Sequence, residues 1–166
     1  MFLPGVRCSG DLWDPCEECF IDFRSTFAEV ALQEAEMKNA RVLIVDDHEI
    51  FRRGLRALLE PSLEWQICGE AVDGMDAVEQ CLSLKPDIVV LDVSMPRLNG
   101  LEAARLIKKQ TPEPQIVIIT QHDSPQIRSA AVEAGARAFV TKSAVGSELV
   151  SALRTIIQGL GETAPD

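Results

Sequence analysis

Five side chains that could bind metal or phosphate lie at the ends of short apolar runs in this 166-residue chain. Three are carboxylates, one is a hydroxyl and one is an ammonium group: Asp46, Asp47, Asp92, Thr120 and Lys142. Carboxylate oxygens suit a hard divalent cation such as Mg²⁺, which neutralises charge during phosphoryl transfer. A carboxylate can also act as a covalent nucleophile and form an acyl phosphate. Together, these groups would support metal-assisted chemistry on phosphate.

The four apolar runs that precede these residues lie at 42–45, 88–91, 116–119 and 138–140. They are rich in β-branched residues, which predicts strands buried on both faces of a parallel sheet. Ligands of such sheets bind at the carboxyl ends of the strands, so the five side chains are expected to share one crevice. Taken singly, each has a simpler interpretation as a solvated loop residue or an ordinary strand residue. Their joint occurrence at several strand ends favours a site.

Helical patterns separate these strands, and a further strand is expected at 65–72. The helices are expected at about 49–59, 74–82, 101–109, 124–133 and 145–158. Ile50 is assigned to the buried face of the first helix and Leu82 to that of the second, and Gly159 and Gly161 are expected to end the last one. Five strand-helix units with right-handed crossovers predict an α/β fold, a (βα)5 doubly wound three-layer sandwich.

The overall charge excludes several classes of partner. The formal net charge is −10, which argues against direct binding to DNA or to an anionic membrane. No apolar stretch approaches a membrane span and the N-terminus lacks the pattern of a signal peptide, so we expect a cytoplasmic protein. Five cysteines without a secretory signal favour reduced thiols. Cys16 and Cys19 have C-x-x-C spacing, but only Cys8 lies near enough in sequence to add a zinc ligand.

Four segments give a specific resemblance. The chain resembles the receiver domain of bacterial two-component response regulators, and is most similar to receivers of the LuxR/NarL/FixJ type, without their helix-turn-helix output domain. The matching segments are LIVDDH at 43–48, LDVSMPRLNG at 91–100, IIT at 118–120 and FVTKS at 139–143. The resemblance implies a flavodoxin-like, CheY-like sheet with strand order 2-1-3-4-5.

The resemblance also implies roles for the acidic residues. Asp92 would be the phosphoacceptor, and Asp46 and Asp47 the acidic pair. Mg²⁺ would be bound by Asp47, Asp92 and the backbone carbonyl of Ser94, with Asp46 acting through water.

The remaining matched residues would support and report phosphorylation. Lys142 would pair with the phosphoryl group, Thr120 would be the switch hydroxyl, and Phe139 would take the place of the switch aromatic. Phe139 lacks the hydroxyl of the Tyr that the family often has there, so it can turn inward but cannot form an outward hydrogen bond. His122 lies where family side chains influence dephosphorylation, or is a solvated loop residue.

By resemblance, the chain is a phosphorylation-dependent signalling switch that receives its phosphoryl group from a sensor histidine kinase or a histidine phosphotransfer protein. It would not be an enzyme with an external substrate, although it would take part in its own phosphorylation and slow dephosphorylation. We expect an N-terminal extension at 1–38, disordered or helical, a receiver domain at 39–160 and a tail at 161–166. A stand-alone receiver and a piece of a longer transcriptional regulator both stay open, as does a homodimer.

Two other classes fit less well. A Mg²⁺-dependent phosphatase of the haloacid dehalogenase type would carry Asp-x-Asp after the first strand, where this chain has Asp46-Asp47-His48. A flavodoxin-like FMN protein would need a phosphate-binding loop there, and two acids would repel the phosphate.

Overall fold

The computed structural model describes residues 39–161. The expectations for the extension at 1–38, and all but the first residue of the tail at 161–166, lie outside the described residues. Five parallel strands form one sheet in the order β2-β1-β3-β4-β5, as the resemblance implied. The strands are β1 (Ala40–Val45), β2 (Trp65–Ala71), β3 (Ile88–Asp92), β4 (Gln115–Thr120) and β5 (Ala136–Thr141). The helices are α2 (Glu49–Leu59), α3 (Gly74–Leu84), α4 (Gly100–Gln110), α5 (Pro125–Glu133) and α6 (Val145–Gly161).

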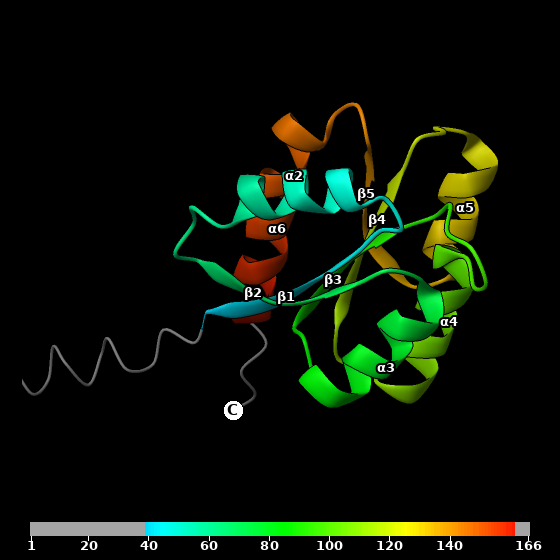
Figure 1. Cartoon of the computed structure of the whole chain (residues 1–166), viewed down its shortest axis with the longest axis horizontal. Helices are drawn as coiled ribbons and strands as arrows, with labels where there is room; N and C mark the ends of the chain where they lie inside the picture. The colour runs from blue at the N-terminus through cyan, green and yellow to red at the C-terminus, as the bar shows by residue number, and fades with distance from the viewer. Residues whose placement is uncertain (1–38, 162–166) are drawn as a thin grey trace, which may run out of the picture. The chain divides into compact units, whose positions relative to one another are not determined.

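The sheet is the middle of three layers. Helices α2 and α6 cover one face, and α3, α4 and α5 cover the other (Figure 1). Successive residues of the central strands point to opposite faces, so Val89 and Leu91 join the core beneath α3, α4 and α5 while Ile88 and Val90 join the core beneath α2 and α6. All four are fully buried, which explains why the strands read as continuous apolar runs.

Side-chain caps fix where three helices begin. Asp73 accepts hydrogen bonds from the backbone N–H groups of the first turn of α3, and Asn99 and Ser124 do the same for α4 and α5. These caps satisfy amides that have no partner inside the helix. Pro125 occupies the first turn of α5, where a missing N–H costs nothing. The β3–α4 connection, which contains the expected metal-binding carbonyl, is therefore anchored at its helical end.

Three sequence expectations about the helices are wrong. Ile50 is 88% exposed, because Phe51, four residues before Leu55, takes the inward place on α2. Leu82 is 48% exposed and lies at the edge of the buried face of α3. Helix α6 continues through Gly159 to Gly161, since a glycine inside a helix costs only about 1 kcal/mol. None of the helices within 39–161 is long and apolar enough to cross a membrane.

Candidate functional site

Three charged side chains from three strand ends meet above the sheet. Asp46 follows β1, Asp92 ends β3 and Lys142 follows β5. The Lys142 ammonium Nζ lies 2.6 Å from Asp46 Oδ2 and 3.1 Å from Asp92 Oδ1. Both carboxylates are only 1% exposed. The expected convergence of Asp46, Asp92 and Lys142 at the carboxyl ends of the strands is therefore observed, although β4 lies between β3 and β5.

Burial and charge act against each other at this site. Burial raises the pKa of Asp92 above its ordinary value, the Lys142 ammonium opposes that shift, and the nearby Asp46 carboxylate adds to it. Burial alone would lower the pKa of Lys142, but the two carboxylates raise it above its ordinary value. Lys142 is therefore held as a cation, while Asp92 carries a charge that is incompletely compensated.

The loop after β3 presents backbone groups to Asp92. The amide of Ser94 donates to Asp92 Oδ2 at 3.1 Å, and the amide of Gly100 donates to the carbonyl of Val93 at 3.0 Å. A Cβ at Gly100 would collide with the backbone carbonyl of Asp92. Only glycine fits where α4 begins against the strand end, which gives a physical reason for the Asn99-Gly100 pair.

The acidic side chains fit a divalent cation. Oδ1 of Asp92 and Oδ1 of Asp47 are buried and accept no regular hydrogen bond from the described residues. With all carboxylates ionised, Asp46, Asp47 and Asp92 outweigh Lys142 by two negative charges, so an oxygen-liganded cation such as Mg²⁺ suits the donor set.

The tightest group of candidate ligand atoms differs from the one expected. Ligand atoms of Asp46, Asp47 and His48 lie within 4.8 Å of one another, whereas Asp92 does not join that group. His48 Nδ1 lies 2.9 Å from Asp47 Oδ1. His48 was not predicted to be a site residue, although its position directly after the acidic pair was an available signal.

Thr120 is at the predicted strand end, but its hydroxyl is engaged elsewhere. The side chain is fully buried. Its Oγ1 accepts from the backbone N–H of His122 at 3.1 Å and lies 3.3 Å from the carbonyl of the same residue, to which it donates. Its own carbonyl accepts from the amide of Lys142 at 2.7 Å. Both hydrogen bonds of the hydroxyl therefore join it to the backbone of the β4–α5 loop, and none of its hydrogen bonds within 39–161 involves Asp46, Asp92 or Lys142.

Phe139 is half-buried at the edge of the core and is covered by a cation. The guanidinium of Arg128, on α5, lies 4.5 Å from the centroid of the Phe139 ring. Two hydrogen bonds, of 2.6 and 2.8 Å, hold that guanidinium against Asp123. The pair of Asp123 and Arg128 was not predicted from the sequence, because a spacing of five residues is not a regular helical pairing.

Two residues of α2 complete the surroundings of Asp46 and Lys142. The Phe51 ring lies 4.5 Å beneath the Lys142 ammonium. Arg52 donates from Nη1 to the backbone carbonyl of Asp46 at 2.8 Å. These contacts position the Lys142 ammonium and the end of β1. Phe51 and Arg52 were not predicted to be site residues, because their contacts join α2 to strand ends that are distant in the sequence or lie across a turn.

Comparisons with known proteins agree with this geometry. The response regulator receiver domain family matches residues 42–154. The response regulator UvrY of Escherichia coli strain K12 is 39% identical over 125 residues, which cover 75% of this chain and 57% of UvrY. The chain thus spans little more than half the length of that relative.

Solved structures show the same fold. A LuxR family two-component response regulator from Aurantimonas sp. SI85-9A1 has a TM-score of 0.70 and 38% identity, covering 74% of this chain and 87% of that chain. The signal receiver domain of NarL from Mycobacterium tuberculosis has a TM-score of 0.69 and 32% identity, covering 73% and 98%. The CheY-like fold is confirmed, and nothing supports the haloacid dehalogenase alternative. The chain belongs to the response regulator receiver domain family, and carries the phosphorylation-dependent switch of two-component signalling.

Proposed function

We propose that Asp92 accepts a phosphoryl group from the phosphohistidine of a sensor histidine kinase or a histidine phosphotransfer protein. The observation that carries this proposal is the buried contact of Asp92 with Lys142 at the carboxyl end of the sheet. A buried carboxylate with an incompletely compensated charge is costly for the fold and is typical of functional sites. Here that carboxylate also lies at the strand ends where ligands of parallel sheets bind.

The transfer would exchange one bond to phosphorus for another. A carboxylate oxygen of Asp92 attacks the phosphorus, the new O–P bond forms, and the N–P bond of the donor histidine breaks. The electron pair stays on the imidazole nitrogen. Lys142 is placed to stabilise the charge on the transferring oxygens, since its ammonium already lies 3.1 Å from Asp92 Oδ1. Slow loss of the group would follow when water attacks the phosphorus, the O–P bond to Asp92 breaks, and inorganic phosphate leaves the regenerated carboxylate.

Mg²⁺ would be held by Asp47, Asp92 and the backbone carbonyl of Ser94, with Asp46 acting through water. The metal would supply positive charge for the phosphoryl oxygens. The buried Oδ1 atoms of Asp47 and Asp92 support this assignment, because each has an ion-pair contact but accepts no hydrogen bond of regular geometry within 39–161. His48 would not be a ligand, because imidazole suits Mg²⁺ less well than oxygen does. Its contact with Asp47 Oδ1 would instead keep that carboxylate oriented.

The switch would run through Thr120 and Phe139. Phosphorylation adds acceptor oxygens at Asp92, and the Thr120 hydroxyl would exchange its bonds with the backbone of His122 for one to the phosphoryl group. Phe139 would then turn inward and leave Arg128 without its aromatic contact. The surface formed by α5, β5 and α6 would change as the population shifts between these two states.

Acetyl phosphate with Mg²⁺, followed by intact mass measurement, tests the proposal. The wild-type chain is expected to gain a single phosphoryl adduct that chelation of Mg²⁺ prevents. Asp92→Asn should gain none, while Asp87→Asn, which replaces an acid at the opposite end of the sheet, should behave as the wild type. An unmodified wild-type chain, or an adduct retained in Asp92→Asn, would contradict the proposal.

The domain boundaries and cellular context belong to the same proposal. We place the receiver at 39–160, between an extension at 1–38 and a tail at 161–166, in a cytoplasmic protein that does not itself contact DNA and is able to form a homodimer. Deleting residues 1–36 should leave the thermal midpoint within a few degrees of the full chain's. A large loss in a calorimetric scan would show that the extension stabilises the domain.

A further inference from the structure

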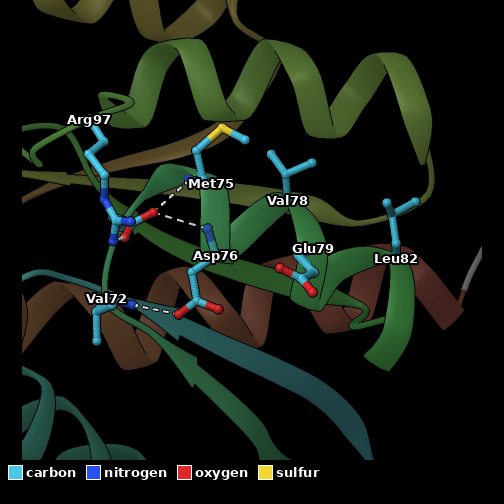
Figure 2. A pocket seen from close by; sticks show the side chains of 8 residues that line it. Val72, Met75, Asp76, Val78, Glu79, Leu82 and Arg97 are labelled. Atoms are coloured by element: carbon cyan, nitrogen blue, oxygen red, sulfur yellow. Dashed lines mark hydrogen bonds and ion pairs between the residues drawn. The ribbon is translucent and has the colours of Figure 1, made fainter.

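A surface groove of about 380 Å³ lies beside α3. The groove is lined from Val72, before the helix, to Leu82 near its end, and Arg97 of the β3–α4 loop closes one side. Figure 2 shows Met75, Val78 and Leu82 following one another along α3 and pointing to the same side. None of the functions assigned above uses this surface.

The apolar part of the groove has the spacing of a helix-binding stripe. Met75, Val78 and Leu82 stand at positions i, i+3 and i+7, so they lie in one row over two turns of α3. Val78 is only 8% exposed and packs in the core, so Met75 and Leu82 supply most of the exposed apolar surface. Met75 is 56% exposed and Leu82 is 48% exposed, and the half-exposed Val72 extends the row beyond the helix. An elongated apolar row of this kind matches the surface by which one helix packs on another.

The charges beside the row are negative. Asp76 and Glu79 lie in the groove wall, and α3 contains no Lys or Arg. The positive charge of Arg97 is already committed, because its guanidinium forms an ion pair with the buried carboxylate of Asp73. Glu79 is exposed and forms no ion pair with any residue within 39–161. The groove therefore favours an occupant that brings cationic side chains next to apolar ones.

Charge argues against two occupants from this chain itself. A second copy packed symmetrically would place Asp76 and Glu79 against the same acids of its partner. Residues 1–38 contain eight acids and three bases, so that segment would also be repelled. A partner of opposite charge fits better than either.

We propose that the α3 groove binds a basic amphipathic helix of a partner protein. Apolar side chains of that helix would contact Met75 and Leu82, and its Lys or Arg side chains would flank the row and pair chiefly with Glu79. Asp76 would add its negative charge, since both of its carboxylate oxygens already accept hydrogen bonds, from the Val72 amide and the Gln80 side chain. None of the residues that line the groove is a proposed phosphoacceptor or metal-binding residue, so its partner need not be the kinase.

A pair of synthetic peptides of about 18 residues serves as the probe, a length that gives about five helical turns. One carries Leu at i, i+3, i+4 and i+7 with Lys elsewhere, and the other carries Glu in place of Lys. Each is titrated into the full-length chain at about 0.15 M salt, which screens unspecific attraction, and amide shifts are followed by NMR. The Lys peptide should move the amides of residues 72–85 first, and the Glu peptide should leave them unchanged.

Three variants decide the outcome. Leu82→Asp removes an apolar contact, and Glu79→Lys reverses an unpaired charge; each should weaken binding of the Lys peptide about tenfold. Leu63→Asp, at a residue that is 86% exposed in the α2–β2 loop, is the matched control and should bind as the wild type does. Retention of the phosphoryl adduct shows that each variant is folded. Absence of binding, shifts centred on other elements, or equal affinities for all variants would overturn the proposal.

Discussion

Lys142→Met tests whether the ammonium holds two buried carboxylates in place. Methionine keeps the length of the side chain and its contact with Phe51, so the change removes chiefly the charge. Asp46 and Asp92, both 1% exposed, would then face each other uncompensated. Removing one partner of a buried ion pair costs about 3–5 kcal/mol, and protonation of Asp92 should limit the loss to about 3 kcal/mol.

Urea unfolding at pH 7.5 in EDTA measures this loss. If the free energy of unfolding falls by about 1.5 kcal/mol per molar urea, the transition midpoint should fall by about 2 M. Asp92→Asn should not lose stability in this way. Its free energy of unfolding should stay within about 0.5 kcal/mol of the wild type's or rise above it, because the variant removes a buried charge and leaves the Lys142 contact with Asp46 intact. Mg²⁺ should restore part of the loss in Lys142→Met, by up to about 2.7 kcal/mol at roughly a hundredfold excess over its Kd.

The difference in stability between the wild type and Asp92→Asn should depend on pH with a defined sign. Burial raises the pKa of Asp92 in the folded state, so the folded chain holds that proton more tightly than the unfolded chain does. Relative to Asp92→Asn, the wild type should therefore lose stability as the pH rises from the ordinary carboxyl pKa through the raised value. A wild type that gains stability over that range, or a Lys142→Met variant as stable as the wild type, would refute the electrostatic reasoning.

Three further predictions concern the switch, the loop and the thiols. Arg128→Ala should leave acetyl phosphate labelling unchanged but let the Phe139 ring turn more freely, seen as averaged aromatic NMR signals; a ring as ordered as in the wild type would argue against a restraining role. Gly100→Ala should lower stability by about 3 kcal/mol or more and slow phosphorylation, since a Cβ there meets the backbone of the phosphoacceptor; unchanged rates would show that the loop can yield. With the other cysteines replaced by serine, the half-buried Cys68 should react with a thiol reagent in the native state faster than Cys81, whose burial raises its pKa to about 12. Equal rates would mean that the α3 region opens readily.

The sheet and the charged cluster were predictable because they depend on strong local signals. Runs such as Ile88–Leu91 are short and apolar at every position, a pattern typical of a strand that is buried on both faces. Once the strands were placed, the geometry of a parallel sheet brought Asp92 and Lys142 together without further information.

The remaining features depend on details that periodicity does not contain. Ile50 and Phe51 are both apolar, and the spacing to Leu55 distinguishes them only once the buried face is known. The Arg128 guanidinium over Phe139 joins an exposed helix residue to the neighbouring strand, and either residue alone reads as ordinary. The Thr120 hydroxyl has several acceptors within reach, so its bonds to the backbone of His122 could not be read from the residue type.

Locating the phosphoryl group tests the central claim most directly. After treatment with acetyl phosphate and Mg²⁺, borohydride reduces an acyl phosphate to an alcohol and thereby converts the modified aspartate into homoserine. Peptide mass mapping should find homoserine at Asp92 alone, and only when Mg²⁺ is present. Homoserine at Asp46 or Asp47, or no homoserine at any position, would contradict the assignment of Asp92 as the phosphoacceptor.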